Sequence, residues 1–139
     1  MDRLTLALLT FDVGVPAASP EAFADRVCAQ VREAWDDGAD LVVLPEFLWM
    51  GLEPFVPGED KLRGVAQLFW TDLWPRLAPR LAQADKGVVL GTVPFLGADG
   101  QLRNRAPIWD GVAFRHQDKL HLTPWESAFV GGDGVGLWS

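Results

Sequence analysis

The stretch Leu41-Val-Val-Leu-Pro-Glu-Phe47 decides how the rest of the chain is interpreted. Its first four residues form a short apolar run, which is typical of a β-strand covered on both faces. Pro45 cannot donate to a strand ladder, so the strand ends there and Glu46 follows at its carboxyl end. Ligands of α/β folds gather at such strand ends. The stretch therefore predicts Glu46 as a candidate functional carboxylate, the alternative being an acid that caps a helix or meets solvent.

The residues before this stretch predict a strand and a helix. Leu4–Phe11 is mostly apolar and indicates a first buried strand. Ser19-Pro20-Glu21 is typical of a helix start, because serine caps, proline fits the first turn and an acid complements the helix dipole. An apolar helix face follows at spacings of four, at Phe23, Val27, Val31 and Trp35. Strand, helix and strand together predict a βαβ unit with parallel strands.

The middle of the chain is less regular. Residues 51–61 are rich in glycine, proline and acids, so we expect a loop there. A helix is predicted from about Leu62 to Ala84, with a break near Trp74 because Pro75 follows it. A third strand is predicted over Val88–Val93.

An antiparallel hairpin is predicted near the end of the chain. Asp110-Gly111 separates the strand-like segments Ala106–Trp109 and Val112–Arg115, and this dipeptide is typical of a two-residue type I′ turn. The parallel pattern therefore acquires antiparallel strands, and the predicted fold class is α/β with a mixed sheet.

Length and composition limit the classes of function. The chain has 139 residues, a formal net charge of −7, 49% hydrophobic residues and one cysteine. These values indicate a single globular domain without a disulfide framework. One cysteine and two histidines are too few for a four-ligand Cys/His zinc site, and the acidic balance argues against a nucleic-acid partner.

Membrane and export signals are weak. The apolar run Leu4–Phe11 is far shorter than the ~20 residues of a spanning helix. Val15–Ser19 resembles a small-residue cleavage site, but Asp12 interrupts the apolar stretch and the side-chain charges of Asp2 and Arg3 cancel. We therefore expect a cytoplasmic protein with no membrane partner.

A second candidate constellation is Asp118-Lys-Leu-His-Leu-Thr-Pro-Trp-Glu126. Lys119 follows a predicted strand, and a lysine in that place can stabilise a developing oxyanion as a fixed positive charge. Glu126 comes seven residues later, after a proline. A surface lysine beside a loop glutamate is the alternative interpretation.

Taken together, five motifs in order resemble the nitrilase or carbon–nitrogen hydrolase superfamily. They are Leu44-Pro-Glu-Phe47, Gly91-Thr-Val-Pro94, Asn104 opening the hairpin, Lys119-Leu-His-Leu122 and Phe129-Val-Gly-Gly-Asp-Gly134. In the last motif Gly131 stands where proline is commoner in the family. The resemblance spans essentially the whole chain.

The resemblance implies half of an α-β-β-α sandwich of the nitrilase type, with residues 1–139 as the N-terminal portion of the domain. It implies hydrolysis of an amide, nitrile or carbamoyl amine through a cysteine thioester. Glu46 matches the general base, Lys119 the oxyanion-stabilising lysine and Glu126 the second glutamate. The implied partners are a small-molecule substrate and further copies of the complete protein; no cofactor or metal is implied.

The nucleophile of that reaction is not found in this sequence. In the family it follows the lysine after one further strand, and Val135–Trp138 is where that strand would begin. Cys28 precedes both motifs and lies on the predicted apolar helix face, which indicates a structural thiol. Ser139 has no nucleophile motif around it. We therefore expect a truncated chain that is inactive alone and prone to associate.

Trp49 and Trp125 closely follow the two candidate motifs, so they are predicted to line a substrate pocket. Two alternatives stay open. One is a non-catalytic α/β module that binds or pairs with another chain; the other is a small flavodoxin-like domain. The latter lacks a phosphate loop after the first strand, because Thr10–Pro16 does not supply one.

Overall fold

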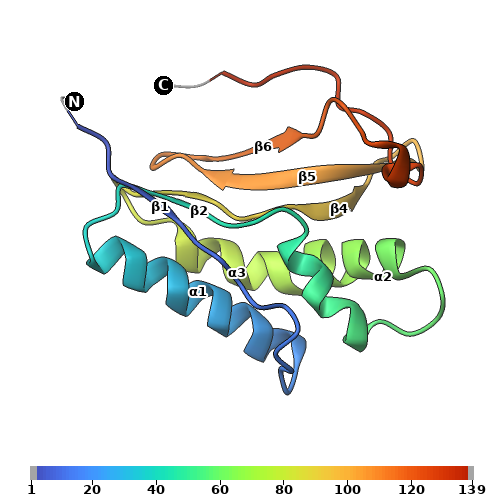
Figure 1. The fold of residues 1–139 in the computed structure, drawn as a ribbon, viewed down its shortest axis with the longest axis horizontal. Helices are drawn as coiled ribbons and strands as arrows, with labels where there is room; N and C mark the ends of the chain where they lie inside the picture. The colour runs from blue at the N-terminus through green and yellow to red at the C-terminus, as the bar shows by residue number, and fades with distance from the viewer. Residues whose placement is uncertain (1–2, 138–139) are drawn as a thin grey trace.

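The computed structural model describes residues 3–137 and has two layers, a mixed β-sheet and a layer of helices on one of its faces (Figure 1). The elements in chain order are β1 (Leu6–Leu8), α1 (Pro20–Asp36), β2 (Leu41–Val43), the 3₁₀ helix η1 (Leu48–Phe55), α2 (Lys61–Gln67), the π-helical η2 (Leu68–Leu73), α3 (Trp74–Leu81), β3 (Gly87–Val89), β4 (Val93–Leu96), β5 (Leu102–Trp109), β6 (Phe114–Asp118) and the 3₁₀ turn η3 (Pro124–Glu126). The α/β class and the mixed sheet are confirmed.

The pairing of neighbouring strands changes from parallel to antiparallel across the sheet. Strands β1, β2 and β3 pair in parallel, and β5 then pairs antiparallel with β3, β4 and β6. The first two parallel strands flank α1, which is the predicted βαβ unit. A flavodoxin-like sheet is entirely parallel, so the antiparallel half of this sheet excludes that alternative.

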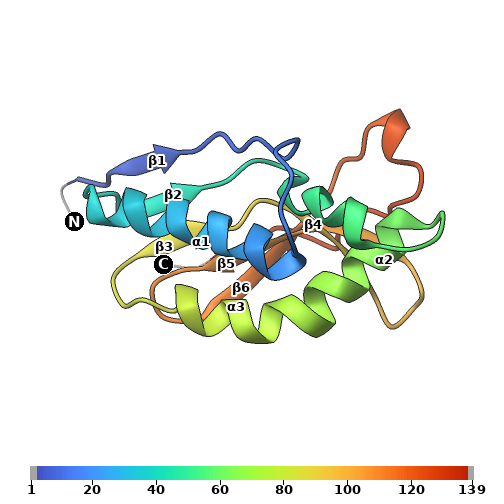
Figure 2. The ribbon, with the colours of Figure 1, turned by 90° about the horizontal axis from the view of Figure 1, so that it is seen from below.

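Helix α1 forms as its sequence predicts. The Ser19 hydroxyl accepts a hydrogen bond from the Ala22 amide, and Pro20 occupies the first turn. The face spaced by four residues is buried against the sheet: Phe23, Val27, Val31 and Trp35 are all at most 3% exposed. In the view from the helical side, α1 lies toward β1 and β2, and α2 lies toward β4 (Figure 2).

Strand β1 is shorter and more exposed than predicted. It is an edge strand of the sheet, and helices cover only one of its faces. Leu6 and Leu8 are 53% and 76% exposed, so the expectation of burial on both faces is wrong. The apolar composition of Leu4–Phe11 could not reveal that one face has no layer packed on it.

The helical region also departs from prediction. Residues 51–61 were expected to form a loop, but η1 covers the first five of them, because Leu48, Trp49 and Leu52 are buried in the core. The predicted break near Trp74 is a change from π-helical to α-helical geometry. A wider turn accommodates the ring of Pro75, which cannot donate a backbone hydrogen bond.

The predicted strand Val88–Val93 is two strands. Gly91 has a left-handed φ of 64° and separates β3 from β4. A Cβ at this position would lie 2.5 Å from the Pro45 carbonyl oxygen and 2.8 Å from the Leu48 Cβ. Glycine is therefore required where this bend passes beneath the segment that carries Glu46.

The hairpin between β5 and β6 is present, but its turn is not type I′. Trp109 pairs with Phe114, which leaves a loop of four residues, and only Gly111 in it has a positive φ. The Asp110 carboxylate accepts hydrogen bonds from the amides of Ala113 and Val112 and closes the loop. Hydrogen bonds from the Ala113 amide, from Arg115 and, to a smaller extent, from the Val112 amide lower the pKa of Asp110 to about 2.

Candidate active site

The Glu46 segment leaves the sheet at the end of β2. The Phe47 amide donates a 2.7 Å hydrogen bond to the hydroxyl of Thr92, which ties this segment to the bend before β4. Phe47 itself has a left-handed φ of 57°, a conformation that bulky residues rarely adopt outside strained, functional segments. Pro45 and the close approach at Gly91 further restrict this backbone. The carboxylate of Glu46 is therefore presented from a rigid loop.

Lys119 is the first residue after β6, as predicted. Its backbone amide donates to the Asn104 carbonyl at 2.9 Å, and its own carbonyl accepts from the Gly132 amide at 3.0 Å. Just before it, Asp118 accepts two hydrogen bonds from Arg105, at 2.7 and 3.0 Å. Hydrogen bonds thus hold both backbone groups of Lys119, the amide and the carbonyl, although its side chain is long.

Glu126 ends the short turn η3, where it forms a capping box with Thr123. Its Oε2 accepts hydrogen bonds from the Thr123 amide at 2.8 Å and from the Thr123 hydroxyl at 3.0 Å. The side chain is only 8% exposed. The Thr123 amide, with Lys119 and the Thr123 hydroxyl, lowers the pKa of Glu126 against the opposing effect of its burial.

The structure brings Glu46, Lys119 and Glu126 together. The Lys119 ammonium lies 2.8 Å from Glu46 Oε1 and 3.1 Å from Glu126 Oε2. The hydrogen bond that Lys119 donates to Glu46, and then the one it donates to Glu126, raise the pKa of Lys119, so the ammonium stays charged at neutral pH. Lys119 and Glu46 are 73 residues apart in sequence, and the contact depends on the tertiary fold.

The three side chains border an open cavity of about 430 Å³. Glu46 is the most accessible of them, with 48% of its side chain exposed, against 30% for Lys119. Apolar walls come from Phe47, Leu62, Trp125, Ala128 and Phe129. The arrangement offers a reachable carboxylate beside a fixed positive charge, which suits proton transfer next to a stabilised oxyanion.

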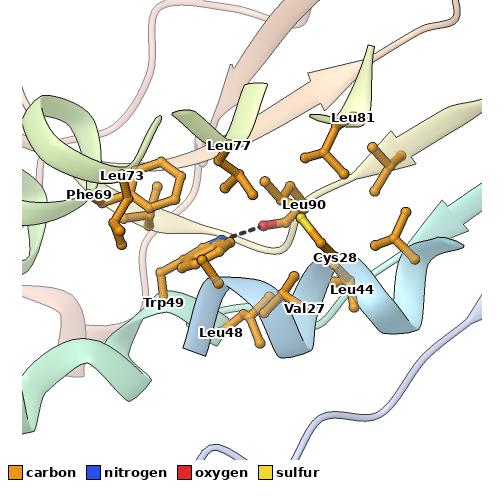
Figure 3. Close-up of a cluster of buried hydrophobic side chains, with 14 of the residues drawn as sticks. Val27, Cys28, Leu44, Leu48, Trp49, Phe69, Leu73, Leu77, Leu81 and Leu90 are labelled. Atoms are coloured by element: carbon orange, nitrogen blue, oxygen red, sulfur yellow. Dashed lines mark hydrogen bonds between the residues drawn. The ribbon is translucent and has the colours of Figure 1, made fainter. Parts of the chain in front are cut away.

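The two tryptophans predicted to line the pocket behave differently. Trp125 does line it and is 91% exposed. Trp49 does not: it is fully buried, and its indole N–H donates to the Leu90 carbonyl at 2.9 Å (Figure 3). The 3₁₀ helix η1 turns Trp49 toward the helical layer, so proximity to Glu46 in sequence does not place it at the cavity.

Sequence reasoning missed three residues that hold the site in place. Asn104 donates to Glu46 Oε1 at 2.9 Å, Thr92 accepts from the amide of Phe47, and Thr123 anchors Glu126. Asn104 and Thr92 lie in motifs that carry the family resemblance, and Thr123 stands three residues before an acid in a capping-box pattern. Those signals marked the positions without giving their roles.

Cys28 lies in the core, as the sequence predicts. It is fully buried on α1, and Figure 3 shows its thiol among Val27, Leu44 and Leu90. Burial is the largest effect on this group and raises the pKa of the Cys28 thiol, which disfavours the nucleophilic thiolate. Of the segment expected to begin the next strand, Val135–Leu137 forms no strand, while Trp138 and Ser139 lie outside the described residues.

The described residues offer neither a cluster of metal ligands nor a membrane-spanning helix. Among residues 3–137, no three or more histidine, cysteine, aspartate or glutamate side chains gather closely enough to hold a metal ion. Within the same range, every helix is too short or too polar to cross a bilayer.

A pH-dependent prediction follows from Glu126. Its folded-state pKa is lowered, so its contribution to stability is present above the ordinary glutamate range and is lost as the pH falls through the lowered value. We expect Glu126→Gln to be less stable than the parent chain at pH 7, with the difference closing in acid. Urea unfolding from pH 7 to 3 measures this.

The matched control for that series is Glu53→Gln, at an exposed glutamate of η1. It should leave the unfolding curve unchanged across the range. A difference between Glu126→Gln and the parent chain that is the same at every pH would contradict the prediction.

Comparison with known proteins shows which fold this is. No family model matches the chain, and no curated protein matches its sequence. Solved structures do match. A carbon–nitrogen hydrolase from Helicobacter pylori G27 is 18% identical with a TM-score of 0.68, over 94% of this chain and 45% of that one.

Two other solved structures agree. A cysteine-to-serine mutant of an amidase of the nitrilase superfamily from Nesterenkonia AN1 is 20% identical, with a TM-score of 0.60, over 94% of this chain and 49% of that one. A glutamine-dependent NAD⁺ synthetase from Acinetobacter baumannii is 21% identical, with a TM-score of 0.59, over 96% of this chain and 25% of that one. The chain shares the fold of these three proteins and spans about half the length of the hydrolase and of the amidase.

Proposed function

We propose that this chain supplies the N-terminal part of a carbon–nitrogen hydrolase, contributing the general base and the oxyanion-stabilising lysine of a cysteine-dependent reaction. The observation that carries the proposal is the Lys119 ammonium, bound between Glu46 and Glu126 at the edge of an open cavity. The fold shared with carbon–nitrogen hydrolases and amidases supports the same class of reaction.

The first half of the reaction acylates a thiol. Glu46 takes the proton of the thiol, so that an S–H bond breaks and an O–H bond forms on the carboxylate. The thiolate sulfur bonds to the amide carbon, and the carbonyl oxygen becomes an oxyanion beside the Lys119 ammonium. The proton then passes from Glu46 to the leaving nitrogen as the C–N bond breaks, which leaves a thioester.

The second half returns the enzyme to its starting state. Glu46, again ionised, removes a proton from a water molecule whose oxygen attacks the thioester carbon. The second oxyanion forms beside Lys119, the C–S bond breaks, and the proton on Glu46 returns to the sulfur. The products are a carboxylic acid and a free thiol.

Glu126 positions Lys119 and does not act as the base. It is almost fully buried, and its Oε2 already accepts two hydrogen bonds from Thr123. Such bonds favour the ionised form and make the carboxylate a poor proton acceptor. Glu46 has six times the exposed side-chain fraction, 48% against 8%, and is the carboxylate that a substrate reaches.

The nucleophilic thiol comes from outside these 139 residues. The one cysteine of the sequence, Cys28, is fully buried on the helical side of the sheet. An attack by Cys28 on a substrate held at Lys119 would require α1 to leave the core. A later segment of a longer polypeptide, or another chain, has to bring the thiol to the cavity.

The substrate class we propose is a small amide. A double mutant of the Nesterenkonia amidase was solved in complex with acrylamide, and its fold covers 94% of this chain. Here Phe47, Trp125 and Phe129 give the cavity apolar walls suited to a short carbon chain beside the polar group.

The first test is amide hydrolysis by the purified 139-residue chain. We expect no ammonia release from acetamide or acrylamide above the buffer rate, because the thiol of Cys28 cannot reach the site. Cys28→Ala is expected to behave identically. Ammonia release that Glu46→Gln abolishes would contradict the absence of a nucleophile, and release that Cys28→Ala abolishes would assign it to Cys28.

A partner-pairing module is the second candidate function. The observation that favours it is the exposed apolar face of the first strand segment at Leu4, Leu6 and Leu8, each at least 53% exposed. An exposed apolar face of this kind is typical of a surface that packs against another chain. The test is sedimentation of the parent chain and of a double variant that carries Leu6→Lys and Leu8→Lys. Self-association that is lost in the double variant, in a chain that does not hydrolyse a small thioester, favours this function.

A further inference from the structure

Asn104 is a buried polar residue next to the candidate base. It lies on β5, is 1% exposed, and is the only asparagine of the chain. Its side-chain nitrogen donates a 2.9 Å hydrogen bond to Glu46 Oε1. Its backbone carbonyl accepts from the Lys119 amide, so one residue contacts both halves of the Glu46–Lys119 pair.

The orientation of this side chain is fixed by the charge of its neighbour. If the Asn104 side-chain amide were rotated by half a turn, its Oδ1 would face the Glu46 carboxylate. Two hydrogen-bond acceptors would then meet with no proton between them. In the observed orientation Oδ1 is buried and has no hydrogen-bond partner among residues 3–137. A buried, unpaired acceptor lowers stability, so Asn104 is a poor choice for this position unless the bond to Glu46 matters.

The two oxygens of Glu46 are not equivalent. Oε1 accepts from both the Asn104 amide, at 2.9 Å, and the Lys119 ammonium, at 2.8 Å. Within residues 3–137, no hydrogen bond ends on Oε2. A proton arriving at Oε1 would have to displace one of those donors, whereas Oε2 accepts it without breaking either bond.

We propose that Asn104 is a positioning residue that, together with Lys119, holds Glu46 by Oε1 and thereby makes Oε2 the atom that receives the thiol proton. The inference rests on the proposed function for the identity of the proton donor. The geometry itself is independent of catalysis, because the carboxylate can be protonated by solvent.

The test uses the parent chain labelled with ¹⁵N only in asparagine, which gives a single side-chain amide pair. The groups that face Asn104 and Glu46 are Lys119 and, through it, Glu126. As acid is added, we expect the Asn104 amide protons to shift when a proton binds the Glu46 carboxylate, because their hydrogen bond ends on that group. They should remain resolved and slow to exchange, because protonation at Oε2 keeps the bond to Oε1.

Two variants identify the source of that shift. Glu46→Gln should remove it, whereas Glu126→Gln, the matched control, should retain it. An amide pair that does not move with pH, or that moves equally in Glu46→Gln, overturns the proposal. Collapse of the pair into rapid exchange with solvent at low pH would show that the proton goes to Oε1, and would also overturn it.

A crystal structure of Asn104→Leu tests the positioning directly. Leucine has a similar shape and offers no donor, so β5 should be unchanged while the Glu46 carboxylate leaves Lys119 or occupies several positions. A Glu46 that stays in place overturns the proposal. These readouts need no turnover: loss of the proposed function with the amide response intact would leave the positioning role standing.

Discussion

Trp49→Ala is expected to lower the free energy of unfolding by about 3–5 kcal/mol, the usual range for truncating a buried aromatic side chain. Trp49 is fully buried and packs against Phe23 and Phe69, with ring centroids 5.7 and 4.7 Å away. The substitution also leaves the Leu90 carbonyl without its indole donor. Both effects act where the segment after Glu46 meets the helical layer.

The matched control is Trp125→Ala, since that indole is 91% exposed. It should change the free energy of unfolding by about 0.5 kcal/mol or less, as surface substitutions do. Urea unfolding of the two variants and the parent chain measures both values. Similar losses in the two variants would contradict the core position of Trp49.

The parts of the fold set by local pattern could be predicted from the sequence. Helix α1 has a capping serine, a proline in the first turn and an apolar face at spacings of four, and it forms as expected. Strand β2 and the proline after it place Glu46 at a strand end. Local propensity and tertiary packing agree in these segments, so the pattern was sufficient.

The parts set by tertiary contact could not be predicted. The bend at Gly91 requires glycine because the Pro45 carbonyl oxygen lies 2.5 Å from where a Cβ would be, a contact between segments that are far apart in sequence. Trp49 follows Glu46 closely but is buried in the core, because η1 begins at Leu48 and packs this residue against the helical layer. Neither contact leaves a signal in the residues next to it.

The charged residues of the site could be predicted from the sequence, whereas the residues that hold them in place could not. Glu46, Lys119 and Glu126 were identified from their motifs, and the fold brings them into contact. The sequence marks Asn104 only as the start of a hairpin, because its role depends on facing a carboxylate 58 residues away. A residue that acts by positioning another side chain can be recognised only when the structure shows the two side chains in contact.

The second large effect concerns the deacylation step. A small acyl thioester of N-acetylcysteamine already contains the carbon–sulfur bond that a cysteine nucleophile would form in the proposed reaction. The chain needs only Glu46 to activate water and Lys119 to stabilise the oxyanion. We expect Glu46→Gln to reduce the catalysed rate by about 10²-fold or more, the usual contribution of a general base.

Lys119→Met should have an effect of similar size. Removing one oxyanion-stabilising group typically reduces a rate by about 10²–10³-fold. Glu53→Gln removes an exposed carboxylate on η1 and is the matched control for charge, while Cys28→Ala controls for the buried thiol. Both controls should hydrolyse the thioester at the parent rate.

The most direct measurement of the central claim is therefore the rate of thiol release from acetyl-N-acetylcysteamine by the purified chain, its Glu46→Gln variant and its Lys119→Met variant at pH 7. The predicted result is hydrolysis above the buffer rate by the parent chain, reduced to that rate in both variants. Hydrolysis no faster than buffer, or hydrolysis that survives Glu46→Gln, would contradict the assignment of Glu46 and Lys119 as base and oxyanion stabiliser.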